Sequence, residues 1–178
     1  MKKDIVKPIA VLVGICFVVT ALLAYVNLVT APIIKEANDK ATAEARAEVL
    51  SEADEFIGVD VPAGYESSIE EIHKAKNGAG YVFKLVTKGY GGKLELICGI
   101  RSDGTIEQVK MLTNSETSGI GSRVVNNDQP YRQQYVGKGE DELSEVDAVS
   151  GATISSKAYI GAIETAFKAY DIVKEAQG

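Results

Sequence analysis

The sequence predicts an α+β protein, with an N-terminal transmembrane helix, a juxtamembrane helix and then an antiparallel sheet packed by helices. Three observations lead to this prediction. Residues 9–30 form a run of 22 residues without a charged side chain. Residues 68–112 hold short apolar runs separated by Asn-Gly and Asp-Gly pairs, which are typical of β-hairpins. Residues 156–173 carry apolar side chains at helical spacing.

The uncharged run from Ile9 to Thr30 predicts a transmembrane helix. As a helix it would be about 33 Å long, enough to cross a hydrocarbon core of about 30 Å. Lys2, Lys3 and Lys7 precede it, so the positive-inside rule keeps the N-terminus in the cytoplasm and the rest of the chain outside. A cleaved signal peptide is the alternative, but its apolar region is normally only about 7–15 residues long. We therefore expect a single-pass protein of the cell membrane.

The composition argues against several classes of function. The net charge is −6, and because Met1–Pro8 contributes +2, the remaining residues carry −8. A chain this acidic, without a basic run or a tryptophan, is not expected to bind nucleic acid, which requires a basic surface. One histidine, His73, and two cysteines, Cys16 and Cys98, are too few for a typical His/Cys metal site or a Ser-His-Asp hydrolase. We expect no metal and no catalytic residue.

Residues from Ile33 to about Phe56 predict a second helix, which continues the anchor or follows a kink at Pro32. Its apolar face is narrow and rich in alanine. The sequence is therefore compatible both with a solvent-exposed stalk and with a helix that packs against a partner protein. Gly58 and Pro62 then break the helical pattern. The predicted organisation is a cytoplasmic N-terminus (1–8), a transmembrane helix (9–31), a juxtamembrane helix (32–57) and an extracytoplasmic domain (58–178).

Four strand-like runs predict an antiparallel meander. They cover residues 68–76, 80–88, 93–101 and 105–112. Apolar and polar residues alternate along them, which predicts one buried face, and the C-terminal helix is the best candidate to cover it. On this pattern Cys98 is a small core residue and His73 lies on a solvated face.

Residues 113–151 show no sustained period, apart from one short helical turn predicted near residues 129–136. A loop of this length in a compact domain is usually functional or disordered. Gly119 and Gly121 permit positive φ, so backbone N–H groups of this loop could approach a planar or anionic ligand. A plain surface loop is the alternative.

The segment Asp147–Thr153 directly precedes the predicted C-terminal helix. Ser155 fits the N-cap, which would place Thr153 just before a helix N-terminus, where N–H groups and the macrodipole favour a phosphate. Gly151 and Ala152 are small enough to let a bulky group reach the Thr153 hydroxyl. By spacing alone, a phosphate site and a merely well-capped helix start fit equally well.

The string D-x-x-S-G-A-T, read from Asp147 to Thr153, resembles the flavinylation motif of the FMN-binding domain family. That domain occurs in the G subunit of the Rnf electron-transport complex and in the C subunit of the sodium-translocating NADH:quinone reductase. The segment from Glu116 to Gly121 is similar to the family's E-T-x-G-[LI]-G segment, and the Gly89-Tyr90-Gly91-Gly92 stretch also matches its pattern. The single N-terminal anchor agrees with the family as well, and the short length, without a large insertion, looks more like the Rnf subunit than the quinone-reductase subunit.

The resemblance implies covalently attached FMN, with a flavin transferase joining the FMN phosphate to the Thr153 hydroxyl. It also implies that the segment beginning at Glu116 lies against the isoalloxazine ring. The expected cofactor-binding residues besides Thr153 are Asp147, Ser150, Gly151, Ala152, Glu116, Thr117, Gly119 and Gly121.

The implied function is that of a covalent-FMN electron-transfer subunit in a membrane ferredoxin:NAD oxidoreductase complex, which couples electron flow to Na⁺ or H⁺ translocation. Its partners would be the other membrane subunits and, during maturation, the flavin transferase. Because a flavin itself takes one or two electrons, the chain needs no acid–base residues for this task. The quinone-reductase subunit or a stand-alone anchored flavoprotein is one alternative, and a cofactor-free anchored scaffold is another.

Overall fold

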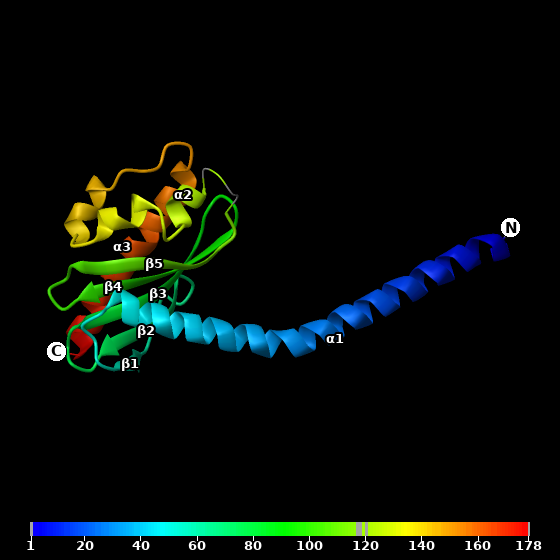
Figure 1. Cartoon of the computed structure of the whole chain (residues 1–178), viewed down its shortest axis with the longest axis horizontal. Coiled ribbons are helices and arrows are strands. Elements are labelled where there is room, and N and C mark those ends of the chain that lie inside the picture. Colours follow the sequence, from blue (N-terminus) through cyan, green and yellow to red (C-terminus); the bar gives the residue numbers. More distant parts are fainter. Residues whose placement is uncertain (1, 117–118, 120, 178) are drawn as a thin grey trace. The chain divides into compact units, whose positions relative to one another are not determined.

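The computed structural model describes residues 2–116, 119 and 121–177 (Figure 1). The chain divides into two units, Met1–Ala41 and Thr42–Gly178, which are described separately. The elements in chain order are α1 (Lys2–Val49), β1 (Phe56–Val59), β2 (Ile69–Ala75), β3 (Gly80–Lys88), β4 (Lys93–Arg101), β5 (Ile106–Asn114), α2 (Ser122–Val125), the 3₁₀ helices η1 (Pro130–Tyr135) and η2 (Glu140–Glu145), and α3 (Thr153–Gln177).

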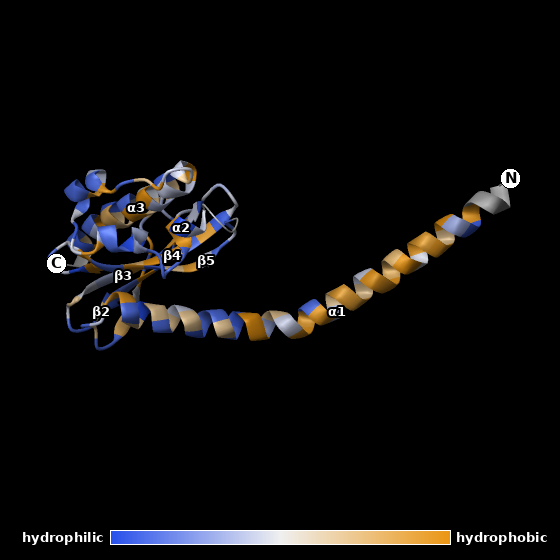
Figure 2. Ribbon diagram, turned by 45° about the horizontal axis from the view of Figure 1, so that its top comes forward, coloured by the Kyte–Doolittle hydropathy of each residue, from blue (hydrophilic) through white to orange (hydrophobic). Residues whose placement is uncertain are grey.

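The first unit is the greater part of α1. This helix contains Pro8 and Pro32 and continues through both of them. Figure 2 shows an almost unbroken apolar stretch along it, followed by a mixed polar stretch. Large apolar side chains such as Phe17, Leu22 and Leu28 are exposed around the apolar stretch, which is what a lipid-facing helix requires. Within the described residues, α1 alone is long and apolar enough to cross a membrane.

The second unit is built on a five-stranded antiparallel sheet in the order β1-β2-β3-β4-β5. The four predicted strands are confirmed as β2 to β5. The two predicted hairpin turns contain Gly78 at φ 77° and Gly104 at φ 86°, left-handed values that favour glycine. The predicted α+β class is therefore correct.

One face of the sheet is covered by α3, as the alternation predicted (Figure 1). Buried side chains of the helix, among them Tyr159, Ile163 and Phe167, share a core with Phe83 and Cys98 of the strands. Cys98 is fully buried, which confirms it as a core residue. This larger apolar cluster holds α3 against the sheet.

The other face is also partly buried, which the sequence did not predict. Val49 and Leu50, at the end of α1, pack with Val82 and Ile97 of the sheet in a second apolar cluster. The predicted helix to about Phe56 is wrong at its end, because Phe56–Val59 pairs with β2 as a strand instead. Tertiary pairing here overrides the helix propensity of residues 50–56.

His73 is a second correction, because it is half-buried rather than solvated. It lies on β2 with Nδ1 at 3.9 Å from Glu71 Oε2, and the same carboxylate pairs with Arg46 at 3.2 Å. Its side chain is 19% exposed. The end of α1, which supplies Arg46, covers a face that the sequence pattern left open to solvent.

The long segment after β5 is folded against the core. The predicted turn near residues 129–136 is present as η1. Tyr131 and Tyr135 of η1 pack with Tyr159 of α3, with ring centroids 5.3–5.6 Å apart. The Tyr135 hydroxyl donates to that of Tyr131 at 2.9 Å. These buried rings tie the segment to α3.

Candidate functional site

The start of α3 is set by a tight turn over residues 149–152. Ala152 N donates to Val149 O at 2.9 Å, and Gly151, the third residue of the turn, has φ 82°. A type II turn needs such a positive φ at its third residue, which favours glycine there. Ala152 is buried, so a small side chain fits. The Ser-Gly-Ala part of the motif thus builds the turn that delivers Thr153 as the first residue of α3.

Four hydroxyl groups lie around this turn, and burial divides them into two pairs. Thr153 and Ser150 are exposed. Ser155 and Ser156 are 1% and 0% exposed. Ser156 Oγ accepts from Val149 N at 3.0 Å, and Ser155 Oγ donates to the Glu116 carboxylate at 2.6 Å. An incoming group can therefore reach Thr153 or Ser150 but not the two buried serines.

The N-cap prediction for Ser155 is wrong. The helix begins two residues earlier, and Ser156 N donates to Ala152 O at 2.9 Å as the first turn closes. Ser155 therefore lies inside the first turn, and its side chain reaches a distant segment instead of capping the helix.

Glu116, just after β5, joins three segments that are far apart in the sequence. Its Oε1 accepts from Ser155 Oγ at 2.6 Å, and its Oε2 accepts from Gly91 N at 3.2 Å. Ser155 Oγ also accepts from Tyr90 N at 3.2 Å. The loop between β3 and β4, the end of β5 and the first turn of α3 thus meet at one carboxylate.

The other predicted site residues that the structure describes come from the segment after Glu116 and from the residues before α3. Gly119 has φ 114°, as expected, but Gly121 has φ −61°, so the expected positive φ is absent there. A β-carbon on Gly121 would lie 2.7 Å from Glu116 Oε2, so this glycine is needed for the close approach of Glu116. Asp147 is exposed, and its N–H donates to the Gln134 side chain at 3.1 Å. Thr117 lies outside the described residues.

Two apolar side chains are exposed beside these contacts. Tyr90 is 76% exposed although its own N–H is held by Ser155, and Ile154, next to Thr153, is 58% exposed. An aromatic ring and an aliphatic side chain in such a place provide an apolar surface for a planar ligand. Sequence reasoning named neither side chain as a ligand contact, because exposure is visible only after folding.

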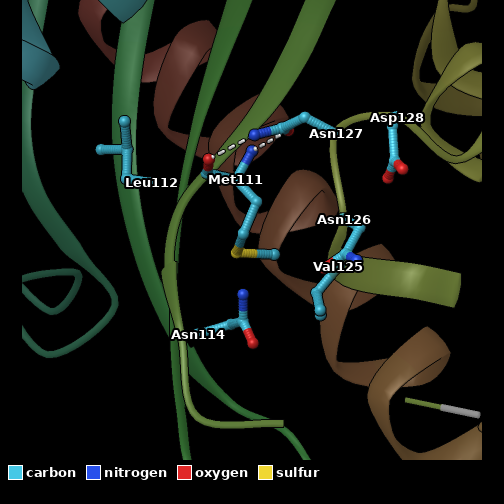
Figure 3. A pocket seen from close by; sticks show the side chains of 7 residues that line it. All are labelled: Met111, Leu112, Asn114, Val125, Asn126, Asn127 and Asp128. Carbon is cyan, nitrogen blue, oxygen red and sulfur yellow. Dashed lines mark hydrogen bonds between the residues drawn. The ribbon is translucent and has the colours of Figure 1, made fainter. Parts of the chain in front are cut away.

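A hollow of about 350 Å³ lies along β5, which forms one edge of the sheet. Figure 3 shows Met111 and Asn114 of β5 facing the segment from Val125 to Asp128 across it. The Asn127 side chain bonds both backbone groups of Met111, each at 2.8 Å, and so closes part of the strand edge. Asn114 Oδ1 accepts from Glu116 N at 3.2 Å, which connects the wall of the hollow to the Glu116 contacts.

The described residues contain no group of three or more His, Cys, Asp or Glu side chains arranged to hold a metal ion. They do fit a phosphate ester. An exposed hydroxyl stands at the first position of a 25-residue helix, where unpaired N–H groups and the helix dipole favour an anion. The turn before it, with Gly151 and Ala152, leaves that hydroxyl unobstructed.

Comparison with known proteins gives a match to the family described as FMN-binding domain over residues 89–168, a range that includes Gly91, Glu116 and Thr153. The chain is 30% identical to the G subunit of the Na⁺-translocating ferredoxin:NAD⁺ oxidoreductase complex of Acetobacterium woodii, covering 88% of each chain. It is 31% identical to the G subunit of the ion-translocating oxidoreductase complex of Methanosarcina acetivorans, covering 92% of this chain and 93% of the relative. It is 25% identical to the G subunit of the proton-translocating ferredoxin:NAD⁺ oxidoreductase complex of Clostridium ljungdahlii, covering 85% and 83%.

Proposed function

We propose a function from one premise: the chain belongs to the family of G subunits of ion-translocating oxidoreductase complexes and carries an FMN-binding domain. On this basis it is the flavoprotein subunit of a membrane ferredoxin:NAD⁺ oxidoreductase complex. Bound FMN can take one or two electrons, so it can connect one-electron and two-electron carriers. The chain's own residues bind and orient the flavin, and the oxidoreductase reaction belongs to the complex.

The finer proposal is that FMN is attached through its phosphate to Thr153. The main support is the difference in exposure among the nearby hydroxyl groups. Thr153 is exposed, whereas Ser155 and Ser156 are buried and hydrogen-bonded. Ser150 is also exposed but lies in the turn, outside the first turn of α3. The helix N-terminus favours the ester phosphate at Thr153 over one at Ser150.

Attachment requires an activated phosphate. Thr153 Oγ1 forms the new bond to phosphorus and loses its proton. A flavin transferase supplies a flavin dinucleotide, whose pyrophosphate P–O bond breaks so that the nucleoside monophosphate departs with the bonding electrons. No electrons are gained or lost in this step, so neither an oxidant nor a reductant is needed.

The residues proposed to surround the cofactor come from both motifs and from the β3–β4 loop. Tyr90 and Ile154 offer exposed apolar surface to the ring system. Backbone groups near Gly119 and Gly121 are proposed to face polar ring atoms. The remaining proposed contacts are Asp147, Ser150, Gly151, Ala152 and Thr117, whereas the Glu116 carboxylate is bonded within the chain.

The apolar stretch of α1 is proposed to anchor the chain with its N-terminus in the cytoplasm and the flavin domain outside. The lysines at positions 2, 3 and 7 support this orientation. Other membrane subunits of the complex are the proposed partners. The names of the relatives include both a Na⁺-translocating and a proton-translocating complex, so both ions remain candidates for this one.

Fluorescence of the denatured chain tests the function. The full chain is produced with and without a flavin transferase and separated on a denaturing gel, where only covalently bound flavin stays with the protein. The proposal predicts a fluorescent band at the chain's mass that depends on the transferase. A colourless, non-fluorescent band in both preparations contradicts covalent FMN. If the native preparation then also lacks flavin absorbance, a cofactor-free anchored scaffold becomes the better account.

A further inference from the structure

Glu116 serves the protein rather than a ligand in this structure. Both of its carboxylate oxygens accept hydrogen bonds from the chain, one from Ser155 Oγ and the other from Gly91 N. A carboxylate also repels a phosphate placed beside it. The contacts within the chain therefore account for an acidic residue at this position better than a contact with FMN does.

The glycines around Glu116 make room for its side chain. A β-carbon on Gly89 would collide with Glu116 Oε1, and one on Gly121 would lie 2.7 Å from Oε2. A β-carbon on Gly91 would collide first with the Ser115 carbonyl oxygen and would lie 2.8 Å from the Glu116 α-carbon, so Gly91 makes room for the backbone that carries Glu116. Three glycines from two separate segments thus converge on a single residue, and each leaves space that a side chain would fill.

The hydrogen bond to Ser155 has a direct consequence for Thr153. Successive residues of an α-helix are rotated by about 100°, so residues two apart face nearly opposite sides. With Ser155 held inward by Glu116, Thr153 must face outward, which agrees with their burial and exposure. A second hydrogen bond, from Val149 N to Ser156 Oγ, also stabilises the first turn of α3.

We propose that Glu116 is a positioning residue for flavin attachment. Its carboxylate fixes the rotation of the first turn of α3 through Ser155, so that the Thr153 hydroxyl faces the flavin transferase. The same carboxylate accepts from Gly91 N, while Ser155 Oγ accepts from Tyr90 N, and together these bonds hold the β3–β4 loop beside that turn. This inference rests on the proposed function, in which Thr153 accepts FMN.

The test compares Glu116→Ala, Ser155→Ala and the double variant with the wild-type full chain in detergent. Glu66→Ala is the matched control, because Glu66 also accepts from a glycine N–H, that of Gly64 at 2.8 Å, in a different loop. Two quantities are measured on each chain. Amide hydrogen exchange of the flavin-free chain reports the order of the first turn of α3 and of the β3–β4 loop, and steady-state kinetics with flavin transferase report covalent labelling.

Loss of a hydrogen bond to a charged group should raise exchange rates at these two places roughly tenfold or more in Glu116→Ala and Ser155→Ala. Labelling should slow by a similar factor. The loss should fall on kcat, with the KM for the protein substrate unchanged, because the folded docking surface is retained. The double variant should lose less than the product of the two single losses, because both changes break the Glu116–Ser155 hydrogen bond. The control should match the wild type.

Wild-type labelling rates in Glu116→Ala would overturn the proposal, as would fully multiplicative losses in the double variant. A general loss of folded protein would raise KM and exchange throughout the sheet, and that result would also count against a positioning role. If the wild-type chain takes no flavin, the proposed function fails. Amide hydrogen exchange of the flavin-free chain still tests whether Glu116 orders the first turn of α3. Unchanged exchange rates in Glu116→Ala would overturn this ordering role, whatever the result for flavin attachment.

Discussion

The carbonyl oxygen of Val49, at the end of α1, occupies the space that a β-carbon on Gly99 of β4 would need. This contact lets the helix end settle directly on the sheet and bury Val49 and Leu50 completely. The glycine at this strand position is therefore explained by packing within the domain.

Gly99→Ala should lower the free energy of unfolding by about 1–3 kcal/mol, because the helix end must move away from the sheet. Urea denaturation of the full chain, followed by circular dichroism, measures the change. Gly58→Ala on β1 is the control, since open space surrounds that position. Equal stability of the two variants would contradict the close contact.

Acidification should destabilise the fold through His73. Burial, and then the positive charge of Arg46, lower the pKa of His73 below its ordinary value of 6.5, while Glu71 raises it less. Because the unfolded chain binds this proton more readily, the stabilising contribution is complete above pH 6.5 and is lost as the pH falls through the lowered pKa. Lys84 Nζ also lies 3.8 Å from the same Glu71 carboxylate, with which Arg46 forms its ion pair.

His73→Gln, which cannot gain a proton, should therefore lose less stability than the wild type as the pH falls from above to below the ordinary His73 pKa of 6.5. Urea midpoints at two such pH values provide the comparison. Parallel losses in the two proteins would show that His73 is not responsible.

The Cys98 thiol should be unreactive in the folded protein. Complete burial raises its pKa to about 12, so almost no thiolate forms at neutral pH. In a Cys16→Ser background, iodoacetamide should modify Cys98 only after the chain is unfolded in urea. Rapid modification without urea would mean that β4 is open to solvent.

Membrane orientation can be tested with reporters fused after the C-terminal residue. Because lysines precede the apolar stretch of α1, an alkaline phosphatase fusion, which is active only outside the cytoplasm, should be active. A β-galactosidase fusion at the same point should be inactive. The reverse pattern would place the flavin domain in the cytoplasm.

The sequence predicted the central sheet well because its information is local. Alternating side chains with Asn-Gly and Asp-Gly pairs located β2 to β5 within one or two residues. The strand Phe56–Val59 was missed because only its pairing with β2 makes it a strand. The packing of Val49 on Gly99 was missed for a related reason, since it joins residues distant in sequence.

In the candidate site too, some features set by neighbouring residues were predicted, and features set by distant residues were missed. The positive φ of Gly119 was readable from the chain, as was the place of Thr153 at the start of a helix. Positive φ was also expected at Gly121, which has φ −61°, and was not foreseen at Gly151, which has φ 82°.

The role of Ser155 was not readable from the chain, because its partner Glu116 is 39 residues away. The N-cap rule gave the wrong answer there because the hydrogen bond from the buried Ser155 hydroxyl to Glu116 competed with local capping.

The most direct measurement of the central claim is the mass spectrum of the tryptic peptide spanning residues 139–157, which contains Thr153 together with Ser150, Ser155 and Ser156. The peptide is prepared from wild-type, Thr153→Val and Ser150→Ala chains, each made with flavin transferase. Thr153→Val keeps the shape of the side chain and removes the hydroxyl. The account predicts one FMN phosphoester on Thr153 in the wild-type and Ser150→Ala peptides, and none in Thr153→Val. Modification at Ser150, or full labelling of Thr153→Val, would contradict it.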